Sequence, residues 1–136
     1  ITIDYGALSS DLYDNRRSSG TLLCYNKHQK NDNPYQFIGS QDITTHTNFS
    51  ALQHWGENYG LDCCGMTDQT NFLLALGVKK YQNDELIKLI NSTQAKIHES
   101  YFNFGLLMRI GMKFKVLIQQ KGVDSKTLSG LRFLNV

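Results

Sequence analysis

Residues 114–120 read Phe-Lys-Val-Leu-Ile-Gln-Gln, and this stretch decides the fold class. Its apolar, β-branched centre and the Lys121-Gly122 pair that ends it are typical of a β-strand. Further strands are predicted on either side of helical patterns. They cover residues 1–5, 21–25 and 61–66, with a short strand or extended loop at 41–46.

Helical patterns separate these strands. Apolar residues recur at helical spacing in two segments that each follow a capping residue and end at a glycine. The candidate caps are Thr47 or Asn48, before Gly60, and Thr67 or Asp68, before Gly77. A longer helix is predicted over 84–102 and a short helix or turn over 106–110. The alternation of strands and helices indicates an α/β protein.

Composition limits the function classes. The chain has 136 residues, 40% of them apolar, and a formal charge of +2, which suits one globular domain. No apolar run approaches the roughly 20 residues of a membrane helix, so no membrane partner is expected. The small charge argues against a nucleic-acid partner. Cys24, Cys63 and Cys64 form no CxxC pair, which favours free thiols and a reducing compartment.

Motifs for cofactors and metals are absent from the sequence, which contains no GxGxxG, Walker or HExxH pattern. Asp4 ends an apolar strand, where open α/β sheets bind ligands, but it could equally cap the following loop. Asp42 has the same two interpretations, as a functional carboxylate or a turn residue. His28 and His46 lie in long loops, where structural hydrogen bonding is the simpler explanation. No three-ligand metal set is expected.

These residues stand within a longer pattern that resembles one family. The stretches that carry the resemblance are Asp4-Tyr5-Gly6, Gly20-Thr21-Leu22 with Tyr25 and His28, residues 39–46 (GSQDITTH) with Phe49, Gln69 with Phe72-Leu73 and Leu76-Gly77, and Phe114-Lys115-Val116-Leu117. They are similar to S-adenosylmethionine-dependent methyltransferases that include the mitochondrial complex I assembly methyltransferase and its bacterial relatives. Leu23, where the family commonly has Arg, and Ile38, where it often has Pro, depart from the pattern.

The resemblance implies a fold and an arrangement of sites. Residues 1–136 would be the distal part of one class I, Rossmann-like methyltransferase domain: its C-terminal half, with a family insertion and a terminal antiparallel strand pair, 61–66 and 114–120. The donor-binding N-terminal half would lie upstream, so S-adenosylmethionine would bind the full-length protein and not this chain alone. Candidate site residues are Asp4 and Tyr5 at the donor rim, His28, Asp42, Thr44 and His46 along the substrate wall, and Phe49 as a substrate contact.

The expected function is the substrate-side wall of an arginine-type protein methyltransferase that is inactive as this chain alone. A guanidinium nucleophile needs a group that orients it and accepts a proton, for which Asp4, His28, Asp42 and His46 are candidates. Two alternatives remain, a protein-interaction module that uses the 20–49 loop and a stand-alone enzyme that uses His28 or His46. Exposed strand edges favour self-association. The expected location is the bacterial cytoplasm, or the mitochondrial matrix in a eukaryote.

Overall fold

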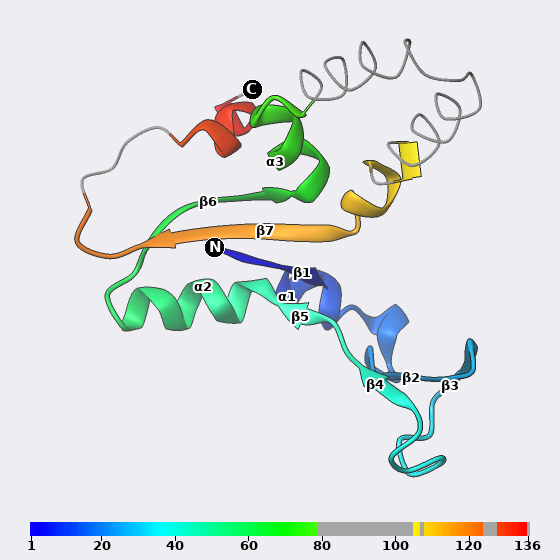
Figure 1. Cartoon of the computed structure of the whole chain (residues 1–136). Helices are drawn as coiled ribbons and strands as arrows, with labels where there is room; N and C mark the ends of the chain where they lie inside the picture. Colours follow the sequence, from blue (N-terminus) through cyan, green and yellow to red (C-terminus); the bar gives the residue numbers. More distant parts are fainter. Residues whose placement is uncertain (79–104, 107, 124–127, 136) are drawn as a thin grey trace, which may run out of the picture.

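The computed structural model describes residues 1–78, 105–106, 108–123 and 128–135. A four-stranded sheet in the order β5-β1-β7-β6 lies at its centre (Figure 1). The strands are β1 (Thr2–Ala7), β5 (Thr47–Asn48), β6 (Asp62–Asp68) and β7 (Phe114–Gln120). Strand β7 is antiparallel to both β1 and β6, whereas β5 is parallel to β1. The predicted terminal antiparallel pair is therefore confirmed as β6 and β7.

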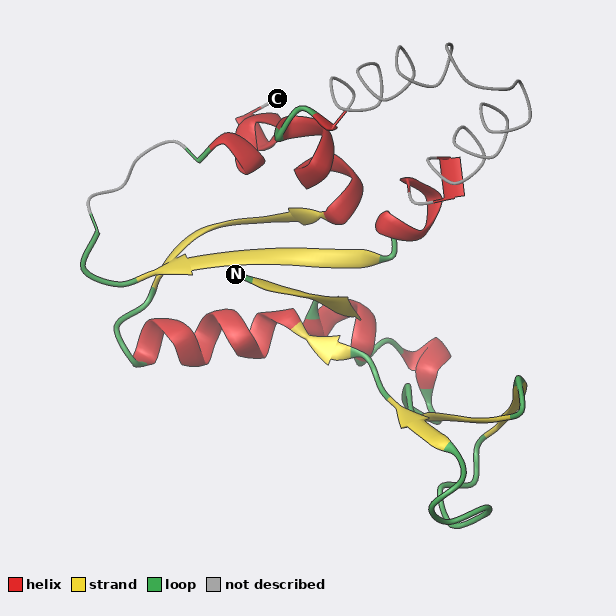
Figure 2. Ribbon diagram, in the orientation of Figure 1, coloured by secondary structure: helices red, strands yellow, loops and turns green. Residues whose placement is uncertain are grey.

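Helices cover both faces of this sheet (Figure 2). Helix α2 (Phe49–Asn58) lies on one face, and α3 (Gln69–Ala75) with the 3-10 helix η2 (Ser129–Asn135) on the other. Two short elements, α1 (Ser9–Leu12) and the 3-10 helix η1 (Asn15–Arg17), follow β1, and residues 108–111 form a helical turn before β7. The expected α/β class is thus observed.

The core is centred on β7, which is apolar along its whole middle because helices cover both of its faces. Val116 and Ile118 form one cluster with Leu131, against which Phe72 and Leu128 also pack. Leu117, 1% exposed, points to the opposite face because side chains alternate along a strand. That face is the one covered by α2.

A second sheet, in the order β3-β2-β4, extends away from the main sheet (Figure 1). Its strands are β2 (Leu23–Asn26), β3 (Gln29–Asn31) and β4 (Asp42–Thr44). A two-residue turn joins β2 to β3, and both of its residues have positive φ, 47° at Lys27 and 65° at His28. Such a turn matches the twist of the flanking strands. Cys24 on β2 is fully buried.

The helix caps follow the sequence prediction. The Asn48 side chain accepts the backbone N–H of Ala51 at 3.1 Å, and the Asp68 side chain accepts that of Asn71 at 2.8 Å. The glycines expected to end the two helices, Gly60 and Gly77, both have positive φ. The N-caps are therefore Asn48, not Thr47, and Asp68, not Thr67.

The segment after β2 and the first strand differ from the sequence prediction. The segment after β2 was expected to be a polar loop, but it contains β3. In the first predicted strand, Ile1 and Ile3 are 75% and 45% exposed, although both are apolar. The helix expected over 84–102 lies outside the described residues.

Candidate functional site

A pocket lies where the end of β1 meets the second sheet, and we call it the aromatic pocket. Its volume is about 540 Å³. The lining residues are Tyr5, Gly6, Thr21, Leu23, Tyr25, Thr44, His46, Lys113 and Phe114. Because β1 ends here, the pocket occupies the position in which open α/β sheets bind ligands.

Tyr5 is the central side chain of this pocket. Its ring makes edge-to-face contacts with the rings of two other residues. The centroid distance is 5.8 Å to Phe114 and 6.0 Å to His46. Its hydroxyl is hydrogen-bonded to the Thr44 hydroxyl of β4. Tyr5 thus joins the main sheet to the second sheet and fixes the orientation of both walls.

Asp4 forms hydrogen bonds within the main sheet. Its Oδ2 accepts the Thr47 hydroxyl at 2.8 Å, and its Oδ1 accepts the backbone N–H of Tyr5 at the same distance. Both carboxylate oxygens therefore stabilise the junction of β1 and β5. The capping interpretation of Asp4 matches this geometry, and Asp4 does not line the aromatic pocket.

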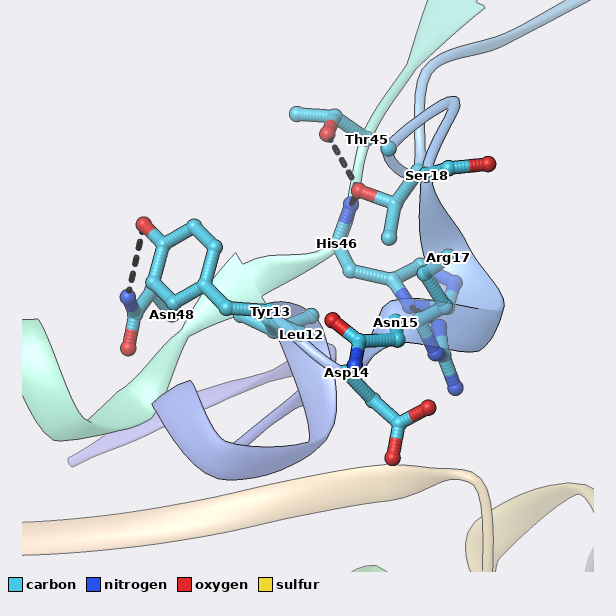
Figure 3. A pocket seen from close by; sticks show the side chains of 11 residues that line it. Leu12, Tyr13, Asp14, Asn15, Arg17, Ser18, Thr45, His46 and Asn48 are labelled. Atoms are coloured by element: carbon cyan, nitrogen blue, oxygen red, sulfur yellow. Dashed lines mark hydrogen bonds between the residues drawn. The ribbon is translucent and has the colours of Figure 1, made fainter.

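A second pocket adjoins the first, and we call it the arginine pocket. It has a volume of about 510 Å³ and shares Thr21 and His46 with the aromatic pocket. In Figure 3, Tyr13 and Asn48 stand on one side of it and Arg17 with His46 on the other. The Arg17 Nη1 lies 3.4 Å from the His46 Nδ1. Since a guanidinium can only donate, Nδ1 is the acceptor of this contact.

Hydrogen bonds to Thr21 position His46. The backbone N–H of His46 donates to the Thr21 hydroxyl at 3.1 Å, and this hydroxyl is 2.8 Å from that of Thr45. The segment between β4 and β5 is thereby tied to the chain that leads into β2. This attachment holds the imidazole between the two pockets.

An ion pair dominates the electrostatics of the arginine pocket rim. Arg16 donates to both oxygens of Asp14, from Nε at 2.7 Å and from Nη2 at 2.9 Å. The Arg16 side chain and backbone hydrogen bonds lower the pKa of the Asp14 carboxyl, and the same contact raises the pKa of Arg16. The charge of Asp14 is thus neutralised by Arg16.

The structure brings together only some of the predicted site residues. Tyr5, Thr44 and His46 line one pocket. Asp42 pairs with Tyr25 across β2 and β4, and residues directly opposite each other share a face, so it extends the same wall.

His28 and Phe49 lie elsewhere. His28 is exposed at the tip of the β2–β3 hairpin and does not line the aromatic pocket. Phe49 was expected to contact substrate, but it is 1% exposed and its ring lies against Gly6. It is the first residue of α2, so its side chain fills the space beneath β1 instead of facing the pocket.

Several residues that line these pockets were not predicted as site residues, and Tyr25, Phe114 and Arg17 are among them. Tyr25 and Phe114 were named only as strand residues and within the family pattern, and Arg17 was not singled out. The signal available for Tyr25 was its alternation with Leu23, which puts both side chains on one face of β2. Nothing in the local sequence distinguishes Arg17 from Arg16.

The described part of the chain contains no group of three side chains placed to hold a metal ion. None of the helices described there is long and apolar enough to cross a membrane. The three cysteines are free thiols, and Cys63 and Cys64 are half-buried on β6, as expected.

Comparisons with known proteins agree with this architecture. Residues 1–67 match the sequence model of a family described as "Putative S-adenosyl-L-methionine-dependent methyltransferase". A search of curated proteins found no match. Two similar solved structures come from Burkholderia thailandensis, and both are described as COG1565 superfamily proteins.

One of these structures contains bound S-adenosyl-homocysteine and is 28% identical to the chain, with a TM-score of 0.77. The alignment covers 96% of this chain and 33% of that one. The other is 29% identical, with a TM-score of 0.77 and coverage of 94% and 34%. The chain therefore spans about a third of the length of these neighbours.

Together the matches support a family of S-adenosylmethionine-dependent methyltransferases and the α/β fold of that class. The matched segment, residues 1–67, contains β1, the second sheet and most of both pockets.

Proposed function

We propose that this chain forms the acceptor-side wall of an S-adenosylmethionine-dependent protein methyltransferase that modifies arginine. The observation that carries the proposal is the aromatic pocket at the end of β1. Most of its lining residues lie within the segment that matches a methyltransferase family, as does the Tyr5–Thr44 contact. The complex I assembly methyltransferase and its bacterial relatives are the finer family assignment within this proposal.

The chemistry of the pocket suits a flat cationic acceptor. Tyr5, Tyr25 and Phe114 offer aromatic rings to one cavity, and a guanidinium binds favourably over such rings. The Asp42 carboxylate on the same wall can orient an N–H group and accept its proton, whereas the acceptor nitrogen of His46, Nδ1, faces Arg17 in the structure. Positioning of acceptor and donor in line supplies much of the rate gain in methyl transfer.

The residues of this chain could border the methyl-donor site, but they do not form the whole of it. S-adenosylmethionine supplies the sulfonium methyl group when bound. Tyr5 and Gly6 lie near the end of β1, where a donor would approach, but both oxygens of Asp4 are already engaged. The chain has no glycine-rich cradle in its sequence. We therefore expect donor binding to need protein beyond these residues, and the chain alone to be inactive.

Calorimetric titration with S-adenosylmethionine tests the proposal, performed on this chain and on the longest protein that its gene encodes. We expect micromolar binding by the longer protein and none by the chain alone. Absence of binding by the longer protein would overturn the methyltransferase assignment. Clear binding by the chain alone would overturn the division of roles and require a complete donor site within these residues.

Two variants of the longer protein test the acceptor wall. Asp42→Ala is expected to raise the KM for the acceptor, because it removes a carboxylate beside Tyr25. The matched control is Asp62→Ala, which removes an exposed carboxylate from β6, on the far side of β7 from β1. Equal rates and KM values in the two variants would remove Asp42 from the site.

A protein-interaction module is the second candidate function, and one observation favours it. Three large apolar side chains stand exposed close together in the 20–49 loop, Tyr35 at 84%, Phe37 at 56% and Ile38 at 82%. Exposed apolar groups that gather on a surface are typical of binding surfaces. The donor titration separates the candidates, since a module has no reason to bind S-adenosylmethionine in any length of protein.

A further inference from the structure

We infer that the arginine pocket binds a carboxylate of the methyl-acceptor polypeptide, beside the residue that enters the aromatic pocket. This inference rests on the proposed function and adds a substrate feature to it: an acidic side chain close in space to the modified one.

Among the described residues, one cation of the pocket has no hydrogen bond to a carboxylate. Asp14 is the acidic residue of the pocket lining, and both of its oxygens are taken by Arg16. Arg17 is the neighbouring cation, and its hydrogen bond is to the ring of His46, although its charge also helps to lower the pKa of Asp14. Arg16 therefore holds both oxygens of Asp14, and the guanidinium of Arg17 lines the pocket.

The donors suit a carboxylate. A guanidinium carries five N–H groups, and within the described residues the hydrogen bond to His46 engages one nitrogen of Arg17. The remaining N–H groups form a planar fork that matches the two oxygens of a carboxylate. The hydroxyls of Thr21 and Thr45 are hydrogen-bonded to each other at 2.8 Å beside His46, which leaves one O–H of the pair as a further donor at the same wall.

The position connects this site to the acceptor. Thr21 and His46 line both pockets, so a ligand that fills the aromatic pocket passes directly beside the arginine pocket. A polypeptide that places one side chain in the first pocket can place a neighbouring side chain in the second. The positive charge of the Arg17 guanidinium favours a negatively charged side chain in the arginine pocket.

The test is a binding experiment on the full chain that needs neither donor nor turnover. The probe is N-acetyl-glutamate N-methylamide, and its matched control is the N-acetyl-glutamine analogue. Binding is followed by NMR on the Arg17 Nε–H and the His46 ring. We expect saturable shifts with the glutamate probe and none with the glutamine analogue. Arg17→Gln should weaken binding of the glutamate probe about tenfold, which corresponds to the low end of the contribution of a hydrogen bond to a charged group.

Arg132→Gln is the matched variant, because it removes the same charge from an exposed position on η2, across the main sheet from the pocket. It should bind the glutamate probe as the wild type does. Equal binding by Arg17→Gln and Arg132→Gln would overturn the inference. So would equal shifts with the two probes, or shifts with inorganic phosphate and none with the glutamate probe.

The donor also carries a carboxylate, so S-adenosylmethionine is titrated under the same conditions. If it displaces the glutamate probe, the pocket belongs to the donor and the inference is overturned. Different experiments test the two proposals. The donor titration of the longer protein tests the methyltransferase assignment, and the probe titration tests the carboxylate site in the arginine pocket.

Discussion

Gly6 lies opposite Thr47 where β1 pairs with β5, and this position has no room for a side chain. A Cβ at this position would overlap the carbonyl oxygen of Thr47 and lie 2.9 Å from Cε2 of Phe49. We expect Gly6→Ala to lower the free energy of unfolding by about 1–3 kcal/mol, as overpacking does. Urea unfolding measures this. Gly105→Ala is the control, since a Cβ there meets nothing within 4 Å; equal effects of the two changes would contradict the prediction.

Cys63 provides a test of burial at a single side chain. Desolvation by burial is the largest cause that raises the pKa of the Cys63 thiol above its ordinary value, and the nearby charge of Glu57 acts in the same direction. A raised folded-state pKa means that this thiol contributes stability below its unfolded pKa, and that the contribution is lost as pH rises through the folded value.

The thiolate is the reactive form of cysteine, so alkylation reports this shift. At pH 8 we expect iodoacetamide to modify Cys63 more slowly in the folded chain than in urea-unfolded chain. Mass spectrometry of the digested protein gives the rate at this site. Folded and unfolded chains that react at the same rate would show that burial does not hold the proton on Cys63.

Asn48 shows how one side chain can organise an element. Its Oδ1 accepts the N–H of Ala51 at 3.1 Å and the Ser9 hydroxyl at 3.0 Å, so it caps α2 and ties α1 to it. Asn48→Ala should cost about 1 kcal/mol of unfolding free energy, the usual loss for an N-cap. Asn48→Asp keeps the acceptor oxygen and should restore most of it. Thermal unfolding of both variants measures these changes in stability. Equal losses of unfolding free energy in Asn48→Ala and Asn48→Asp would contradict the capping role.

The elements that the sequence predicted correctly are those with strong local signals. Strand β7 has a continuous apolar run, and the caps Asn48 and Asp68 precede helical spacing that ends at a glycine. Strand β3 was missed because its residues are polar and its turn uses Lys27 and His28 at positive φ, where the usual signal is glycine. Strand β5 has two residues, too few for any pattern.

The candidate site was predictable only as far as strand ends could be located. Tyr5 ends the strand predicted over 1–5 and lies within the observed β1, Thr44 ends β4 and His46 follows it, and the three do meet in one pocket. Phe49 could not be separated from them by sequence, because an aromatic residue after a loop looks the same whether it faces a pocket or the core. The Arg17–His46 contact joins segments 29 residues apart, and no local pattern encodes it.

At the scale of the whole molecule, the main sheet has two edges without a partner strand among the described residues, the outer side of β6 and the start of β1. Strand β1 pairs with β7 from Thr2 to Tyr5, but within the described residues it pairs with β5 only at Gly6 and Ala7. The edge of residues 2–5 that faces away from β7 therefore offers backbone groups for a further strand. Unpaired edges with apolar side chains are sites of association between chains.

We therefore expect the isolated chain to self-associate as its concentration rises, through this edge of β1. Ile3 is 45% exposed there, and Ile3→Lys places a charge on the edge, which should shift the chain toward monomer. Val123→Lys is the control, since Val123 is 62% exposed in the loop after β7 and away from the edge. Sedimentation velocity over a concentration series measures the outcome. A wild-type chain that stays monomeric throughout, or an Ile3→Lys chain that associates as strongly as Val123→Lys, would show that β1 is not the contact.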